Sequence, residues 1–162
     1  MVSTLDCLRI LSAHDVEYVV VGGVAGVLHG SRLVTEDVDI CAPLNISNLA
    51  KLLIAIGDSN PRFRMTPDRK PLPATPSQLA EFKNLYLITD LGQIDILSEI
   101  TGVGDYEEVC KHAITVDLGG FTCRVLDLDT LILAKSAMNS LKDRQAVLEL
   151  KSIKDRIQCQ NP

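Results

Sequence analysis

The chain has no tryptophan, and aromatic residues make up only 4% of its 162 residues. It also has no apolar run of the roughly 18 residues that a membrane-spanning helix needs. Acidic side chains occur within the first 15 residues, where a secretory signal peptide would be apolar. These absences predict a cytoplasmic protein that does not interact with a membrane.

Cysteine and histidine are few and dispersed. The 5 cysteines and 3 histidines form no CxxC, HxxxH or HExxH group. An odd number of widely spaced cysteines is typical of reduced intracellular thiols and not of a disulfide framework. Neither a zinc site nor a Cys/His nucleophile is therefore expected.

Positive charge is scarce, with 16 Lys and Arg against 21 Asp and Glu and a net charge of -5. Nonspecific binding of nucleic acid normally uses clustered basic side chains, so a broad nucleic-acid surface is not expected. Residues 61–71 are the local exception, because four basic residues stand there against one acid. This segment is either a solvated loop whose prolines prevent regular structure or a mobile basic flap over an anionic substrate.

The rest of the composition is that of one globular domain. Hydrophobic residues make up 46% and charged residues 23% of the chain, whose length suits a single core. We therefore assign residues 1–158 to one domain and residues 159–162 to a frayed tail.

Apolar periodicity and turn residues predict helices alternating with strands, an α/β chain of the α+β type. The expected helices cover residues 4–14, 24–30, 45–56, 105–112, 127–138 and 142–158, with a short one opening at Ser77. The expected strands cover residues 18–23, 36–42, 85–90, 93–100, 113–118 and 121–126. The third and fourth strands flank Leu91 and Gly92, and so short a connection predicts an antiparallel hairpin.

Residues 21–40 carry most of the functional information. An apolar strand ends at Gly22 and Gly23, a short helix follows, and the next strand contains Asp37 and Asp39. Successive strand residues point to opposite faces, so the two carboxylates share one face and Val38 lies on the other. Two acids opposite an apolar face are poor core residues and plausible metal ligands.

A third carboxylate, Asp95, lies between two isoleucines that should face the core. If its strand lies beside that of Asp37 and Asp39, the three carboxylates meet and repel until a divalent cation neutralises them. Mg²⁺ takes such oxygen ligands, with Mn²⁺ as an alternative ion. Two ions at one site can activate an attacking oxygen and stabilise a leaving one.

The glycine pair predicts a phosphate site next to these acids. Gly22 and Gly23 let a phosphate approach the backbone, and a helix beginning near Val24 directs its N–H groups at the same place. Arg32 and Thr35 are placed to add a guanidinium group and a hydroxyl. A nucleoside triphosphate such as ATP would fit between the helix and the metal.

Each of these residues also has a purely structural explanation. Asp37 and Asp39 are then solvated acids of an edge strand, and Asp95 is a surface acid. Gly22 and Gly23 are then turn residues, and Arg32 and Thr35 ordinary loop residues. The Asp-x-Asp pattern alone does not decide, because it recurs at residues 127–129, where a helix cap explains the first acid.

A dinucleotide-binding loop is a further alternative, because residues 21–26 read V-G-G-V-A-G after a strand. Val21 occupies the position of the first glycine of GxGxxG, however. The following helix is also too short for a parallel crossover. This alternative is therefore disfavoured.

Residues 18–40 resemble the core motif of the DNA polymerase beta-like nucleotidyltransferase superfamily, an apolar strand followed by Gly-Gly and then Asp-x-Asp. The form GGxA followed by R-x-x-T-x-D-x-D-I is most similar to small bacterial and archaeal members, some of them toxins of toxin–antitoxin systems. The matching residues are Gly22, Gly23, Ala25, Arg32, Thr35, Asp37, Asp39 and Ile40. Asp95 resembles the third carboxylate, and Lys135, Lys142 and Asp143 match positions in the late helices.

The resemblance implies a mixed sheet with helices packed mainly on one face, followed by C-terminal helices. It implies transfer of a nucleotidyl group from an NTP with loss of pyrophosphate, to a hydroxyl of tRNA, a protein or a small molecule such as an antibiotic. The implied catalytic and metal-binding residues are Asp37, Asp39 and Asp95, and the implied nucleotide-binding residues are Gly22, Gly23, Arg32, Thr35 and Lys135. The alternative is a catalytically idle nucleotide-binding or antitoxin-like protein that acts through a protein partner.

Overall fold

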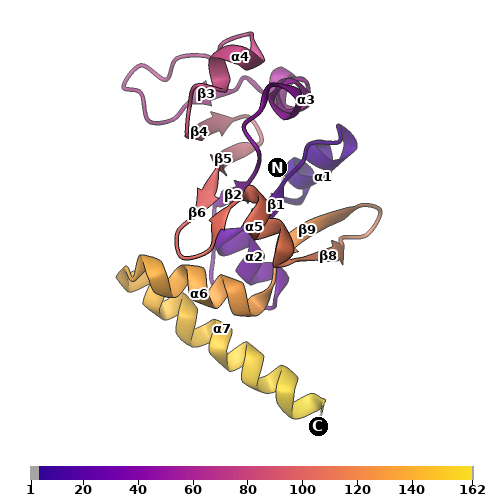
Figure 1. Ribbon diagram of the computed structural model, residues 1–162, viewed down its shortest axis with the longest axis vertical. Coiled ribbons are helices and arrows are strands. Elements are labelled where there is room, and N and C mark those ends of the chain that lie inside the picture. Colours follow the sequence, from indigo (N-terminus) through magenta and orange to yellow (C-terminus); the bar gives the residue numbers. More distant parts are fainter. Residues whose placement is uncertain (1–3, 162) are drawn as a thin grey trace.

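The computed structural model of the chain describes residues 4–161, and its main element is a seven-stranded mixed sheet (Figure 1). The strands of this sheet lie in the order β3-β4-β5-β2-β1-β9-β8. They are β1 (Val19–Val21), β2 (Asp37–Cys41), β3 (Arg62–Phe63), β4 (Asn84–Thr89), β5 (Gly92–Leu97), β8 (Ala113–Asp117) and β9 (Thr122–Leu126). Because β2 pairs parallel to β5 and antiparallel to β1, the predicted mixed sheet is confirmed.

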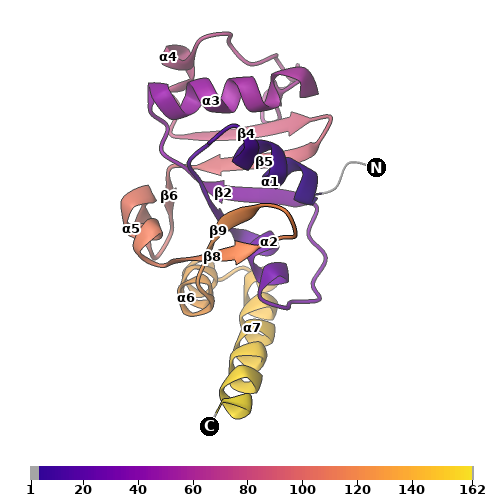
Figure 2. The ribbon, with the colours of Figure 1, turned by 90° about the vertical axis from the view of Figure 1, so that its right-hand side faces the viewer.

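The helices follow the predicted order along the chain. They are α1 (Thr4–Ala13), α2 (Gly22–Leu28), α3 (Ile46–Ile56), α4 (Pro76–Leu79), α5 (Tyr106–Lys111), α6 (Leu128–Met138) and α7 (Leu141–Gln160). A 3₁₀ turn, η1 (Gly57–Ser59), extends α3. Figure 2 shows α1 and α3 in front of the same face of the sheet, while α6 and α7 lie at its lower end.

Buried residues of α2, α6 and α7 form one part of the hydrophobic core, and another part forms on the sheet face covered by α1 and α3. Val38 and Ile40 of β2 are buried there, as are Ile94 and Ile96 of β5. Helix α3 supplies the buried residues Leu49, Leu52 and Ile56, which recur at helical spacing. The alternation along β2 and β5 therefore leaves their acidic residues on the opposite face.

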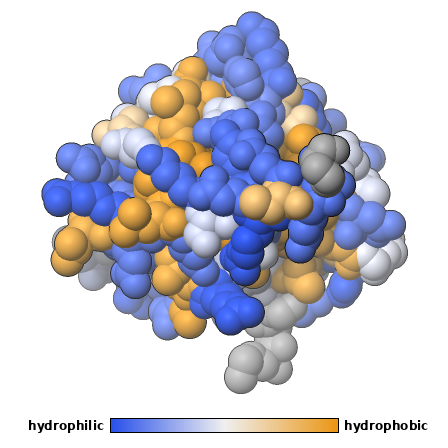
Figure 3. Space-filling model, turned by 90° about the horizontal axis from the view of Figure 1, so that it is seen from below, coloured by the Kyte–Doolittle hydropathy of each residue, from blue (hydrophilic) through white to orange (hydrophobic). Residues whose placement is uncertain are grey.

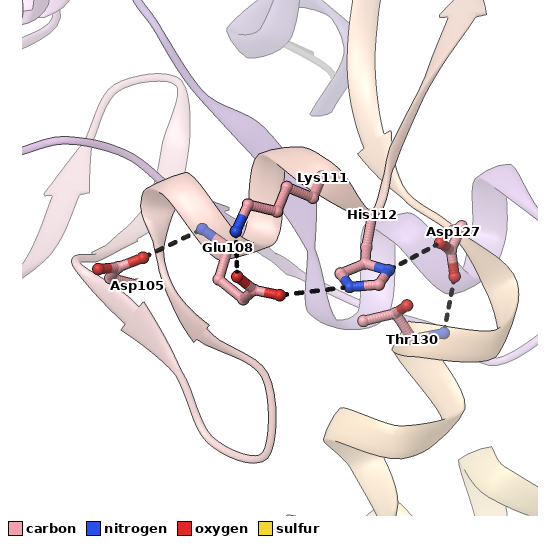
Figure 4. A network of polar contacts seen from close by, with 6 residues as sticks. All are labelled: Asp105, Glu108, Lys111, His112, Asp127 and Thr130. Atoms are coloured by element: carbon pink, nitrogen blue, oxygen red, sulfur yellow. Dashed lines mark hydrogen bonds and ion pairs between the residues drawn. The ribbon is translucent and has the colours of Figure 1, made fainter.

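A polar network fixes the position of α6, which borders the site (Figure 4). Asp105 caps α5 by accepting from the Glu108 N–H, and Asp127 caps α6 by accepting from the Thr130 N–H. His112 lies between the two helices, with ring nitrogens 3.6 Å from Glu108 and 3.8 Å from Asp127. The start of α6 is thereby tied to α5.

Helix α7 begins with a capping box, in which Ser140 and Asp143 bind each other's backbone N–H groups. Its far end projects away from the sheet (Figures 1 and 2). Seen from below, this end of the molecule has apolar residues interspersed among polar ones (Figure 3). Within residues 4–161, no helix combines the length and the apolarity needed to cross a bilayer.

Several element boundaries differ from the prediction. Helix α2 begins at Gly22 and not at Val24, and the strand predicted over 93–100 breaks at Ser98, so that β6 (Glu99–Ile100) pairs separately with β7 (Gly104–Asp105). Residues 61–71 are not without regular structure, because β3 pairs with β4 and Arg62 also bridges to Pro71. Cys159 and Gln160, predicted to be frayed, are the last residues of α7, while Ser3 and Pro162 lie outside the described residues.

Candidate active site

Strand pairing places the three predicted carboxylates next to one another. In the parallel register of β2 and β5, Asp39 is the direct partner of Asp95, and Asp37 is the partner of Gln93. Side chains in register on adjacent parallel strands point to the same face, so the three acids share the face opposite the core. The condition for the three carboxylates to meet, that their two strands lie side by side, is therefore met.

The Asp95 carboxylate is held by an arginine that the sequence did not single out. Arg64 Nη2 donates to Asp95 Oδ1 at 2.5 Å and to Oδ2 at 2.6 Å. The Arg64 backbone N–H donates to the Tyr86 carbonyl, and its guanidinium lies 5.8 Å from the centre of the Tyr86 ring. Arg64 Nε is buried without a hydrogen-bond partner. One cation thus neutralises part of the carboxylate cluster.

Asp39 is the acid whose charge is least well stabilised. Burial raises the pKa of Asp39 to about 6, and the nearby Asp95 charge adds to this increase. Lys135 and a hydrogen bond from the Gly23 backbone N–H act in the opposite direction. A cation bound beside Asp39 would therefore stabilise its ionised carboxylate.

The donor set suits a hard divalent cation, because carboxylate oxygens are the ligands that Mg²⁺ and Mn²⁺ prefer. The unfavourable ionisation of Asp39 beside Asp95 indicates that further positive charge would be accommodated there. Within residues 4–161, however, no three Asp, Glu, His or Cys side chains are yet gathered closely enough to hold a metal ion. Asp95 accepts from Arg64 instead, so a third carboxylate ligand requires that contact to open.

The glycine pair accommodates the neighbouring side chains. Gly22 has φ +64°, and an added Cβ would overlap the Asp39 carboxylate. An added Cβ at Gly23 would lie 2.6 Å from the Thr35 hydroxyl oxygen. The side chains of Asp39 and Thr35 therefore occupy the space beside the two glycines, which the sequence suggested for a phosphate.

Two cavities meet at these residues. The first, which we call the glycine cavity, has a volume of about 360 Å³. Its walls include Gly23 and Thr35, and the two cationic side chains Lys135 and Lys142 face it from α6 and α7. Glu36, Asp37 and Asp39 line the same cavity, so the backbone glycines and two lysines would suit an anion such as a polyphosphate once a cation neutralises these carboxylates.

The second cavity, which we call the apolar cavity, has a volume of about 400 Å³. Apolar side chains of α6 and the sheet line one part of it, and polar or charged side chains, among them Asp95, Lys83 and Glu99, line the rest together with Tyr86. Gly22, Asp39 and Lys135 line both cavities, so they mark the junction between them.

Lys135 is held at this junction by α7. Its Nζ lies 3.4 Å from Asp143 Oδ1, and the two side chains are 17% and 7% exposed. Burial opposes ionisation of Asp143, but hydrogen bonds from Ser140 and the charge of Lys135 lower the pKa of Asp143 overall. The capping box of α7 therefore also positions the lysine of the site.

Arg32 is not brought together with the other predicted residues. Its side chain is exposed and lines neither the glycine cavity nor the apolar cavity. Its backbone N–H instead donates to Glu149 of α7 at 2.8 Å, and the Ser31 hydroxyl donates to the same carboxylate. Thr35 lines the glycine cavity, as predicted for a residue near the phosphate, and donates to the Asp37 carbonyl at 3.3 Å.

Sequence reasoning missed Arg64, Tyr86 and Glu149. Arg64 lies in the basic segment 61–71, but no local pattern separates it from the other basic residues there. Only the pairing of β3 with β4 and of β4 with β5 brings it to Asp95. The one available signal was that Arg62 and Arg64 are two residues apart, as are residues on one face of a strand. The prolines of the segment argued against a strand there.

Comparisons with known proteins identify the fold. A scan against models of protein families finds no match, and a search of curated proteins also finds none. A solved structure of the lincosamide antibiotic adenylyltransferase LnuA, with lincomycin bound, aligns with a TM-score of 0.60 and 18% identity over 90% of this chain and 92% of its own. A Thermotoga maritima protein described as a candidate nucleotidyltransferase aligns more loosely, with a TM-score of 0.45 and 18% identity over 97% and 92% of the two chains. The similarity to LnuA shows that the chain has the nucleotidyltransferase fold expected from its resemblance to the polymerase beta-like superfamily.

Proposed function

We propose that the protein is a Mg²⁺-dependent nucleotidyltransferase that transfers an NMP group from an NTP, such as ATP, to an acceptor hydroxyl and releases pyrophosphate. The observation that carries this proposal is the pairing of Asp39 with Asp95 at the junction of the glycine and apolar cavities. Asp39 lines both cavities, Asp95 lines the apolar cavity, and the largely buried Lys135 lies at the same junction, an arrangement that supports a functional role for the pair.

The triphosphate is assigned to the glycine cavity. Lys135 and Lys142 supply positive charge there, and Thr35 adds a hydroxyl. Arg32 remains a candidate phosphate ligand only if its exposed side chain turns inward, since its backbone alone is now fixed by Glu149.

Asp37, Asp39 and Asp95 are the proposed catalytic residues and the proposed ligands of two Mg²⁺ ions, with Mn²⁺ as a substitute. When bound, such ions neutralise the charge that develops on the attacking and leaving oxygens. Asp95 would also accept the proton of the acceptor hydroxyl, because it lines the apolar cavity and not the glycine cavity assigned to the triphosphate. Arg64 must first release this carboxylate.

The acceptor class is the open part of the proposal. LnuA is named as an antibiotic adenylyltransferase and binds lincomycin, which makes a small molecule the first candidate here. A tRNA or a protein hydroxyl is the alternative expected from the resemblance to toxin–antitoxin members. A cytoplasmic location, where NTPs are abundant, is part of the same proposal.

The direct test is incubation with each α-labelled NTP, Mg²⁺ and a total cell extract. The wild-type protein should transfer label, and Asp39→Asn should not. Asp129→Asn is the matched control, because Asp129 belongs to the second Asp-x-Asp of the chain and forms only an exposed ion pair with Lys154. Equal transfer by wild type and Asp39→Asn would refute the assignment.

A second candidate is a catalytically idle nucleotide-binding or antitoxin-like protein with a protein partner. The ion pair between Arg64 and Asp95 favours it, because an arginine already neutralises the third carboxylate. This candidate predicts that ATP binds without turnover in every extract fraction. Any stoichiometric release of pyrophosphate would exclude it.

A further inference from the structure

The apolar cavity differs in chemistry from the glycine cavity, although the two share Asp39. Leu131, Ala134 and Met138 of α6 form one of its walls, one helical turn apart, and Ile100 contributes from β6. Tyr86 and Asp95 contribute from β4 and β5. The remaining lining is polar or charged and includes three carboxylates and two lysines, so a hollow of about 400 Å³ here combines an apolar wall with a charged one. Such a combination suits a small organic molecule that has an apolar face and polar groups.

The direction of the reaction assigns an occupant to this cavity. In an in-line displacement the attacking and leaving oxygens lie on opposite sides of phosphorus. If pyrophosphate leaves toward the lysines of the glycine cavity, the acceptor must approach from the side of Asp95. The apolar cavity is the hollow on that side of Asp39.

We propose that the apolar cavity binds the acceptor, and that the acceptor is a small, uncharged or cationic organic molecule with an apolar face and a free hydroxyl. This inference rests on the proposed function. The acceptor oxygen forms a bond to the α-phosphorus as the bond from that phosphorus to the β-phosphate oxygen breaks. Asp95 takes the hydroxyl proton, and pyrophosphate leaves.

The charges around the cavity argue against a nucleic-acid acceptor. Each lysine that lines it is already paired, Lys83 with Glu99 at 2.6 Å and Lys135 with Asp143 at 3.4 Å. Asp39 and Asp95 add negative charge at its inner end. A polynucleotide would bring phosphates to a surface with no unpaired lysine, whereas an uncharged or cationic molecule meets no such repulsion.

Binding can be tested without any transfer, by using the uncharged fluorescent probe N-phenyl-1-naphthylamine. Ala134→Trp should fill the cavity and weaken probe binding at least about tenfold, while the affinity for a fluorescent ATP analogue stays within about twofold. Leu133→Trp is the matched control, because Leu133 is the adjacent residue of α6, is 54% exposed and lines neither cavity. Met138→Glu, at a position 60% exposed, places a charge at the same cavity with little risk to folding.

Transfer is then measured separately with α-labelled ATP and three extract fractions: small molecules, RNA and protein. We expect label in the small-molecule fraction. Molecules of that fraction should also displace the naphthylamine probe from the apolar cavity. Label in RNA or protein, or loss of ATP binding in both Ala134→Trp and Met138→Glu, would overturn the inference without contradicting nucleotidyl transfer by the wild-type protein. Absence of label from all three fractions would instead overturn the proposed function itself.

Discussion

The contact between Arg64 and Asp95 leads to a specific prediction about metal binding. Arg64 makes two hydrogen bonds to the carboxylate, and the side chains are 24% and 14% exposed. If a divalent cation and Arg64 compete for the same oxygens, Arg64→Gln should tighten the binding of Mn²⁺ or Mg²⁺. The substitution removes the charge and keeps a side chain of similar reach.

The size of this effect follows from the strength of the contact. A hydrogen bond between charged groups contributes about 1.5–3 kcal/mol, and the residual exposure of both side chains reduces this to about 1–2 kcal/mol. A metal that no longer has to displace Arg64 gains this amount. The expected result is metal binding that is roughly 5- to 30-fold tighter.

The assay is titration of the nucleotide-free protein with Mn²⁺, following free Mn²⁺ by electron paramagnetic resonance. Arg62→Gln is the matched control, since Arg62 precedes Arg64 by two residues, is exposed and donates from its side chain to the Arg69 carbonyl. It removes the same charge from the same segment without freeing Asp95. Unchanged or weaker Mn²⁺ binding in Arg64→Gln would show that Arg64 orients Asp95 and does not compete with the metal.

Three further predictions concern the junction of the cavities. Because burial raises the pKa of Asp39 from 3.8 to about 6, its ionisation costs folding free energy that is absent well below the unfolded pKa of 3.8, grows as pH rises toward about 6 and is complete above about pH 7. Without metal, Asp39→Asn should therefore be more stable than wild type by about 3 kcal/mol in urea unfolding above about pH 7, and the difference should vanish near about pH 3. A difference independent of pH would contradict this. Gly22→Ala should lose at least about 1–2 kcal/mol of stability in thermal unfolding and all transfer activity, because the φ of Gly22 is +64° and an added Cβ would overlap Asp39. Gly26→Ala is the control and should fold normally, because an added Cβ there makes only ordinary contacts. Lys135→Gln should weaken ATP binding about tenfold in calorimetry, while the same change at the exposed Lys151 should leave it unaltered.

The carboxylates of the site could be predicted because their signals are local. Alternation with Val38 and with the isoleucines of β5 determines the face on which Asp39 and Asp95 lie. The hairpin of β4 and β5 was likewise predictable from the short turn at Leu91. What remained conditional was the parallel pairing of β2 with β5, since these strands are far apart in the chain and no turn sets their register.

The role of Arg64 could not be predicted from the same signals. Its position depends on two successive strand pairings, and its own strand, β3, is only two residues long. The packing of the glycine pair could not be predicted either. The missing Cβ atoms accommodate Asp39 and Thr35, which become visible as neighbours only once α2 folds back on β2.

The central claim is that Asp39 and Asp95 act together in nucleotidyl transfer. The most direct measurement is the ratio of pyrophosphate released to label transferred from α-labelled ATP, in wild type, Asp39→Asn and Asp95→Asn. We predict one pyrophosphate per transferred label in the wild type, and loss of both products in each variant. Undiminished transfer by Asp95→Asn, or release of phosphate in place of pyrophosphate, would contradict the account.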